Sequence, residues 1–316
     1  MQRLSVTTLL AVLVGLVGAH AASSSTLVAR NAKNLHLYVR GDRALVTFSE
    51  YGVSKRVLVS GAVNALKPTP EVPQVKFALD YGPRKRTESL FTKASSCRKY
   101  DGPKLAFFVT GCKAPDGSYW AIQRWRYWWP FFGYAPWLTY QRDWAYHISH
   151  WTGPIAKIEL WSDWIDRAHG STAPHFVFGR LIYNDVPVYG FRAGNGGQPL
   201  DGYGRVLYWE SLDSKLGAGW WRLTGILARN PSGTFCHAMV PLPTYSNYPD
   251  PHVVDAGNGK RYRVYAEGPG VTPLVLAEVD DPGNWDPNNA AKVARFNRGR
   301  GLLADWNVAP ACRKGH

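Results

Sequence analysis

The chain has 316 residues, of which 45% are hydrophobic, 19% charged and 14% aromatic. This length and apolar content support one large folded unit or two smaller ones, and they exclude a coiled coil and a disordered acidic chain. No apolar run has the length of a membrane-spanning helix, which argues against a polytopic membrane protein. Lys and Arg outnumber Asp and Glu by 37 to 23. Such a balance favours anionic partners, although it also simply keeps a secreted protein soluble.

The N-terminus has the three parts of a secretory signal peptide. Arg3 supplies the positive charge, residues 9–17 form a short apolar core, and Ala19-His20-Ala21 places small residues where a signal peptidase cleaves. We therefore predict export and cleavage after Ala21. Residues 22–34 are predicted to be a flexible lead-in, and residues 35–316 a globular unit. If this unit divides into two lobes, residues 167–172 are the predicted join.

Four cysteines in an exported chain indicate two disulfides. They are Cys97, Cys112, Cys236 and Cys312, and no C-x-x-C spacing suggests a zinc ribbon or a redox motif. Three pairings are open to four cysteines. We favour Cys97–Cys112, which closes a short loop around one apolar strand, and Cys236–Cys312, which would hold the C-terminal tail.

The chain reads as short strands separated by turns, in places with clean alternation of apolar and polar residues. Two helices are predicted, one over residues 287–296 with Asp286 as its cap and a short one around residues 141–150. Gly179 suggests a bulge or a close backbone approach, and Pro187 suggests a sheet edge. No fixed repeat supports a propeller or a β-helix. The prediction is an all-β or β-dominated fold of mostly antiparallel sheets, sandwich or barrel-like. The predicted strands are 35–40, 44–49, 54–60, 74–81, 105–110, 118–123, 155–161, 176–183, 186–191, 205–210, 235–240, 262–266 and 275–279.

Aromatic residues are concentrated between residues 120 and 164, where nine of the 14 Trp lie. Trp and Tyr bury large areas and offer flat faces on which sugars or bases stack, and interleaved Arg residues would attract an anionic polymer. Core packing explains many of these rings equally well. Residues 128–134 differ because their Pro and Gly indicate a loop. The predicted ligand-binding residues are Trp125, Arg126, Trp128, Trp129, Phe131 and Tyr134.

Two alternative hypotheses involve enzymatic chemistry. His147 and His150 would share a face on a helix and could hold a metal ion, but they would point to opposite sides of a strand. Glu159 and Asp163 would share a strand face with Trp161 between them, and a glycoside hydrolase needs two carboxylates across its substrate. Structural or surface histidines and solvated surface carboxylates are the more common explanations of such pairs. No motif in the chain indicates a cofactor or specific nucleic-acid recognition.

Several stretches resemble a family of uncharacterised secreted bacterial proteins that has no known activity. They cover residues 60–66, 112–120, 147–151 and 199–205. The resemblance implies export but identifies no catalytic or binding residues. Taken together, these observations predict a secreted, disulfide-bonded, β-rich protein that binds an extracellular glycan or an anionic cell-wall polymer through its aromatic loop. The alternatives are a glycan-active hydrolase and a metal-dependent enzyme.

Overall fold

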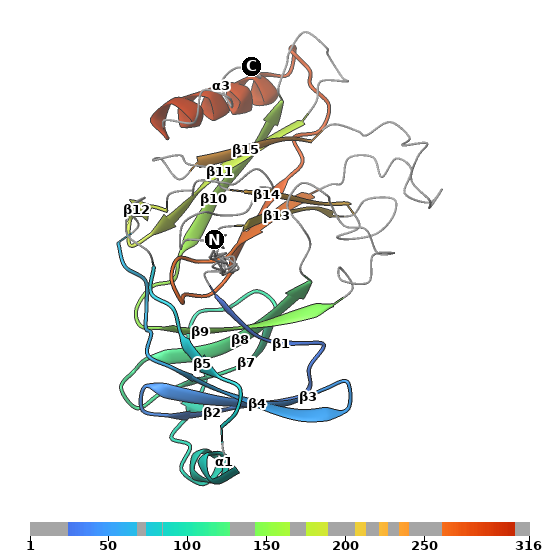
Figure 1. Cartoon of the computed structure of the whole chain (residues 1–316). Helices are drawn as coiled ribbons and strands as arrows, with labels where there is room; N and C mark the ends of the chain where they lie inside the picture. Colours follow the sequence, from blue (N-terminus) through green and yellow to red (C-terminus); the bar gives the residue numbers. More distant parts are fainter. Residues whose placement is uncertain are drawn as a thin grey trace, which may run out of the picture.

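The computed structural model describes residues 25–67, 74–83, 85–126, 143–164, 175–188, 206–212, 221–226, 234–239 and 261–306. These residues form antiparallel sheets with two helices, and none of the sheets among them closes into a barrel (Figure 1). The prediction of a β-dominated, antiparallel fold is therefore confirmed. No helix in the described ranges has the length and apolar content needed to cross a membrane.

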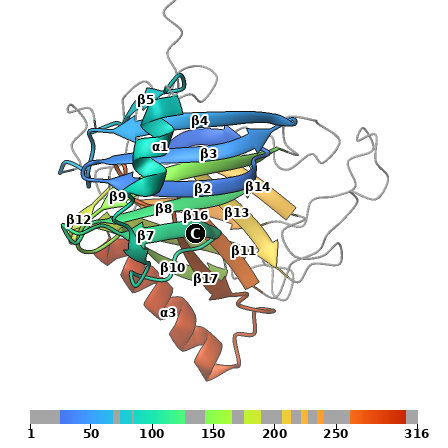
Figure 2. The ribbon, with the colours of Figure 1, turned by 90° about the horizontal axis from the view of Figure 1, so that it is seen from below.

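The first half of the described chain forms two facing sheets. One has the strand order β2-β3-β4-β5 and the other β1-β9-β8-β7-β6. Helix α1 crosses the outer face of the first sheet, as the view from below shows (Figure 2). The elements are β1 Thr26–Arg30, β2 Lys33–Arg40, β3 Arg43–Glu50, β4 Val53–Ser60, β5 Ala78–Asp80, α1 Lys85–Lys93, β6 Arg98–Lys99, β7 Phe108–Lys113, β8 Tyr119–Arg126 and β9 Trp144–Trp151.

Strand alternation builds the core between these two sheets. Val46 of β3 and Val57 of β4 point inward and are fully buried, as are Trp120 and Ile122 of β8. The ring of Phe77 stacks on Trp120 with centroids 5.7 Å apart. Because successive strand residues alternate in direction, the residues between these core positions point to the outer faces.

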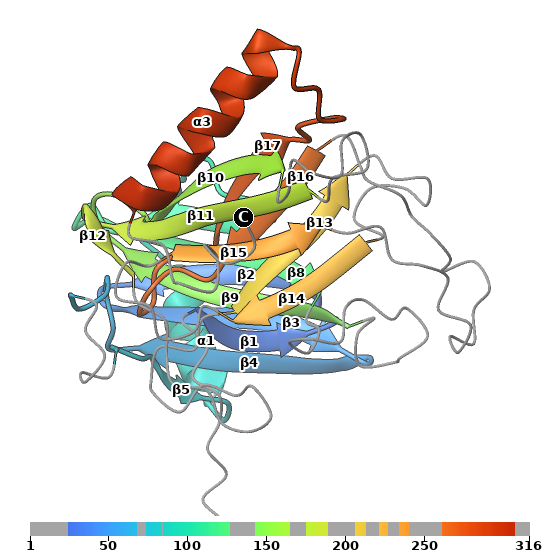
Figure 3. The same cartoon turned by 90° about the horizontal axis from the view of Figure 1, so that it is seen from above.

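The second half carries two further sheets and helix α3, seen from above in Figure 3. One sheet has the order β10-β11-β12 with β15 also paired to β11, and the other has the order β14-β13-β16-β17. Phe178 of β11 and Leu303 of α3 pack together, which places the helix on the β10–β11 sheet. The elements are β10 Lys157–Trp164, β11 His175–Tyr183, β12 Val186–Pro187, β13 Val206–Leu212, β14 Trp221–Ile226, β15 Thr234–Met239, β16 Arg261–Ala266, β17 Val275–Asp280 and α3 Ala290–Asp305.

The connection between β16 and β17 joins the two halves. Its Val271 amide donates to the Asn64 carbonyl at 3.2 Å, and its carbonyl accepts from the His150 amide at 3.0 Å. The Gln123 side chain accepts from the Leu274 amide at 2.9 Å and donates to the Leu274 carbonyl at 2.9 Å. All residues from 266 to 275 are buried, so these bonds supply partners that water cannot reach.

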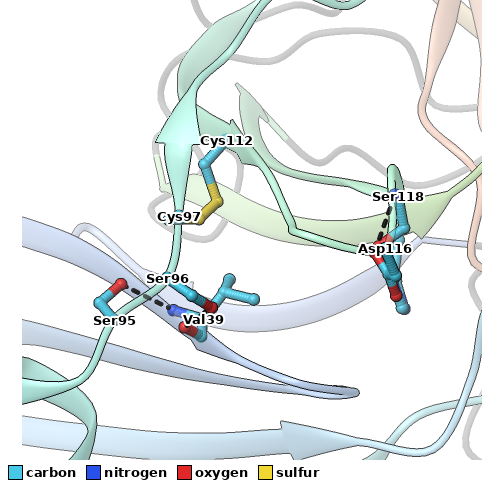
Figure 4. The surroundings of a disulfide bond; sticks show 8 residues. Val39, Ser95, Ser96, Cys97, Cys112, Asp116 and Ser118 are labelled. Atoms are coloured by element: carbon cyan, nitrogen blue, oxygen red, sulfur yellow. Dashed lines mark hydrogen bonds between the residues drawn. A yellow bond between two sulfur atoms is a disulfide. The ribbon is translucent and has the colours of Figure 1, made fainter.

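A disulfide joins Cys97, just before β6, to Cys112 in β7, as predicted (Figure 4). Next to it, the Val39 amide of β2 donates to Ser95 Oγ at 3.3 Å, so the segment before the disulfide also borders the facing sheet. The pairing of Cys236 with Cys312 stays a prediction, because Cys312 lies outside the described residues. The predicted signal peptide and the join at residues 167–172 lie outside them as well.

Most predicted strands are present with shifted ends. The hairpin across Asn184-Asp185 is confirmed, and both residues have the positive φ that such a turn requires (48° and 59°). Gly179 makes the predicted close approach, because a Cβ there would overlap with the Glu159 carbonyl. Strand β12 pairs only with β11, which places Pro187 at an edge among the described strands.

Four expectations were wrong. The flexible lead-in contains β1, which is ordered because it pairs with β9. The helix expected at residues 141–150 is replaced by strand β9, whose two neighbours β1 and β8 satisfy its backbone. Only residues 78–80 of the strand predicted at 74–81 pair, and α1 was not predicted at all. Helix α3 begins later than expected, since Asn289 rather than Asp286 caps it by accepting from the amides of residues 291 and 292.

Two glycines in α3 allow a matched test of how the helix packs. A Cβ on Gly299 would overlap with the Asp163 carboxylate of β10, whereas a Cβ on Gly301 would meet nothing within 4 Å. We expect Gly299→Ala to lower the free energy of unfolding by about 1–3 kcal/mol through overpacking. Gly301→Ala should raise it by about 0.5–1 kcal/mol, because Ala loses less backbone entropy in a helix.

Urea denaturation of both variants measures the difference. Equal stability of the two variants would show that α3 does not rest on β10 at Gly299.

Candidate functional site

The end of the β8–β9 hairpin brings together the residues on either side of the aromatic segment. Arg126 of β8 is paired with Trp144 of β9, and Arg124 with Tyr146. The described chain therefore ends at Arg126 and resumes at Asp143 beside the same end of the sheet. The predicted binding residues Trp128, Trp129, Phe131 and Tyr134 belong to this segment and lie outside the described residues.

Two arginines stack on one tryptophan at this end. The guanidinium carbons of Arg124 and Arg126 lie 4.7 and 4.8 Å from the ring centroid of Trp144. Arg124 also lies 6.0 Å from the ring centroid of Tyr146 and is exposed to solvent. Cation–π contacts of this kind hold a flat guanidinium at a fixed angle. The result is a basic, aromatic surface beside the aromatic segment.

Asn31 fixes the β9 side of this surface. Its side-chain oxygen accepts from the Trp144 amide at 2.9 Å, and its side-chain nitrogen donates to Asp143 Oδ1 at 2.5 Å. Its amide donates to the Trp144 carbonyl at 2.8 Å. Asn31 adopts a left-handed backbone with a φ of 46°, which Asn tolerates better than most residues. The turn between β1 and β2 thus sets the position of Trp144.

Trp125 lies on the other face of the sheet from Arg124. Its side chain is 1% exposed and packs with Tyr265 and Leu274 in the interior. Its ring stacks on His147 with centroids 3.9 Å apart. One face of the indole is therefore already covered by the protein's own imidazole, whereas Arg126 reaches the arginine–tryptophan surface.

His147 and His150 point to opposite sides of β9, as expected for a strand. His147 Nδ1 lies 3.1 Å from the Ser25 carbonyl, and burial lowers the pKa of its ring to about 3. His150 Nδ1 lies 2.7 Å from the Ala62 carbonyl, and burial lowers its pKa as well. Within the described ranges, no group of three or more His, Cys, Asp and Glu is placed to hold a metal ion. This geometry does not bring the two imidazoles to one ion.

Glu159 and Asp163 share a face of β10 but differ in their surroundings. The Glu159 carboxylate accepts from Arg180 Nε at 2.6 Å, whereas Asp163 is buried beneath α3. Their Cα atoms are four residues apart on a strand, roughly 13 Å. Carboxylates that cleave a glycosidic bond lie about 5–10 Å apart in an accessible cleft. The geometry does not bring this pair together around a substrate.

One polar cluster was not anticipated from the sequence. Asp281, directly after β17, accepts a hydrogen bond from the Tyr262 hydroxyl and pairs with His175 Nδ1 at 2.5 Å. Burial raises the pKa of Asp281, but the bonds from His175 and Tyr262 outweigh it and hold the pKa below its usual value. Burial and the bond to Asp281 raise the pKa of Tyr262, so its hydroxyl stays protonated and donates.

The neighbours of this cluster indicate a structural role. Ser162 Oγ donates to the Asp280 carbonyl at 2.5 Å, and Trp164 Nε1 donates to the Gly283 carbonyl at 2.7 Å. Residues 280–283 are thus held by three side chains of the β10–β11 sheet, and the cluster joins that sheet to β16 and β17. In enzymes, the same pairing of a carboxylate with His Nδ1 orients an imidazole that acts as a catalytic base. Sequence separations of 87 and 106 residues from His175 explain why no local pattern reveals it.

The chain matches no protein-family model, and searches of curated proteins and of solved structures gave no match either. The resemblance to a secreted bacterial family therefore stays a prediction.

The buried carboxyl group of Asp163 should make the free energy of unfolding depend on pH in an unusual direction. Burial raises its pKa from 3.8 to about 6, against the opposing effects of the Trp164 amide and of Arg295. The folded state then binds the proton more tightly than the unfolded state, so this group lowers stability as the pH rises from about 4 to 6. Asp163→Asn should remove that decline and raise the free energy of unfolding at neutral pH by up to about 3 kcal/mol.

Urea denaturation of both proteins from acidic to neutral pH measures the effect. Parallel stability curves for the wild type and Asp163→Asn would contradict it.

Proposed function

We propose that this is an exported protein that binds an anionic extracellular polymer at the β8–β9 end of its first half. The observation that carries the proposal is the pair of guanidinium groups, Arg124 and Arg126, held on Trp144 at 4.7 and 4.8 Å. Fixed guanidinium planes suit bidentate contacts with carboxylates or phosphates. The signal-peptide pattern at the N-terminus supports export, where such polymers occur.

The distribution of charge along the chain supports a binding site in the same half of the molecule. Residues 25–152 carry 19 Lys and Arg against 8 Asp and Glu, while residues 153–316 carry 17 against 15. Nearly all of the positive excess thus belongs to the half that contains β1 to β9. Long-range attraction of a polyanion would be directed there, and it would weaken at high ionic strength.

The aromatic segment adds a second kind of contact to this proposal. Trp128, Trp129, Phe131 and Tyr134 follow Arg126 directly in the chain. Ring faces bind the C–H faces of sugars, and this contribution is not screened by salt. We propose that the arginines attract the polymer and that the rings of residues 128–134 select a glycan within it.

Co-sedimentation with isolated bacterial cell wall tests the role of the arginines. The double variant Arg124→Gln/Arg126→Gln should lose binding about tenfold or more at low salt, because two fixed charge-assisted contacts disappear. The control is Arg40→Gln/Arg43→Gln, which removes the same charge at two exposed positions in the β2–β3 hairpin.

The control variant should bind almost as well as the wild type. Equal losses in the two variants would reduce the interaction to net charge and overturn the site. A folded Trp128→Ala/Trp129→Ala variant that binds normally at high salt would overturn the role of the rings.

A further inference from the structure

A second group of rings lies at the β6–β7 side of the same sheet. Tyr100 lies 5.1 Å from Phe108 and 5.6 Å from Tyr119, measured between ring centroids. Tyr119 in turn stacks on the buried Trp151 at 5.5 Å. These rings occupy the sheet face that points away from the sandwich core, since their β8 neighbour Trp120 belongs to that core. Arg124 and Arg126 project from the other face of β8, the face of Trp120, although Phe108 is paired with Gln123, the neighbour of Arg124.

Phe108 is the exposed member of this group and is held in place from two sides. Its side chain is 42% exposed. Its ring lies over Gly111, where a Cβ would come within 2.9 Å of it, and is tilted by 36° against the ring of Tyr100. The Tyr100 hydroxyl donates to the Pro103 carbonyl at 2.6 Å. A large apolar ring that is fixed yet exposed, on a strand rather than a loop tip, is typical of a binding surface.

The disulfide keeps this surface rigid. Cys97, just before β6, is joined to Cys112 of β7 (Figure 4). The two cysteines pack on the core face of the same sheet, and Tyr100 directly follows β6. Preorganised rings lose little conformational entropy when a ligand binds.

Charged groups border the rings on the same face. Lys113 Nζ lies 5.4 Å from the ring centroid of Tyr119 and donates to Asp101 Oδ2 at 3.1 Å. Arg98 is paired with Lys113 across β6 and β7 and is exposed. Two cations, Lys113 and Arg98, thus accompany one carboxylate. An occupant of this surface would meet a flat ring next to a net positive border.

We propose that Phe108, Tyr100 and the Lys113–Asp101 pair form a sugar-stacking platform for an acidic polysaccharide, with one pyranose on the Phe108 ring. The inference rests on the proposed export, but it uses a surface separate from the arginine–tryptophan end. One exposed ring with adjacent donors and acceptors has the size of a single sugar, whereas a stable protein partner would need several hundred Å² on each side. The cationic border favours a sugar that carries a carboxylate over a neutral one.

Affinity electrophoresis through gels that contain polygalacturonate or dextran tests the platform. Phe108→Ala should lower the apparent affinity for polygalacturonate by about tenfold, a typical loss when a central ring contact is removed. Tyr51→Ala is the matched control, because Tyr51 is 78% exposed at the β3–β4 turn. Arg98→Gln should weaken binding to polygalacturonate at low salt, and thermal unfolding verifies that every variant is folded.

The possible outcomes distinguish binding at this platform from binding at the β8–β9 end. Loss of polygalacturonate binding in Phe108→Ala but not in Arg124→Gln/Arg126→Gln would support the platform and count against the proposed arginine site. The reverse pattern would overturn the platform and leave the arginine site standing. Equal retardation by dextran would overturn the preference for an acidic sugar. A wild-type protein that neither gel retards would overturn the platform, while cell-wall co-sedimentation would still decide the proposed function.

Discussion

The buried connection between β16 and β17 is the contact on which the arrangement of the two halves depends. Every residue from 266 to 275 is buried, so each backbone amide and carbonyl there needs a partner within the protein. Gln123 supplies both bonds to Leu274, and the Val271 backbone bonds to Asn64 and His150. Leaving one such group unpaired would cost about 1–3 kcal/mol. This requirement fixes where the second half contacts the β8–β9 pair.

That contact also determines which parts of the sheet remain available to a ligand. Gln123 and Trp125 of β8 and His147 of β9 face the interior, and their side chains are nearly inaccessible to solvent. Arg124 and Arg126 project from the opposite face of β8, whereas Phe108 of β7 is paired with Gln123 and stays 42% exposed. The contact with the second half therefore covers one face of β8 and leaves Arg124 and Arg126 on the other face.

The sequence predicted those parts of the fold whose pattern is local. Strand β3 alternates between the core and the outer face, and its turn residues bound it on both sides. Strand β9 has no such alternation, because seven of its eight residues are buried and both of its faces are covered. A short helix around residues 141–150 is therefore the prediction that the sequence alone supports there. Strand β1 depends on pairing with residues more than a hundred positions away, which no local pattern encodes.

The candidate sites differ in the same respect, because some features follow from local sequence and others from contacts between distant residues. The arginines beside the aromatic segment are adjacent in sequence, so their association was predictable, but their stacking on Trp144 requires the register of β8 and β9. The cluster of His175, Tyr262 and Asp281 depends on two sheets meeting, and the Phe108 platform depends on a glycine beneath the ring. Charge acts over about a Debye length and gives little selectivity, whereas a fixed ring acts only on contact. A polymer-binding protein that uses both would gather its ligand with the first and distinguish it with the second.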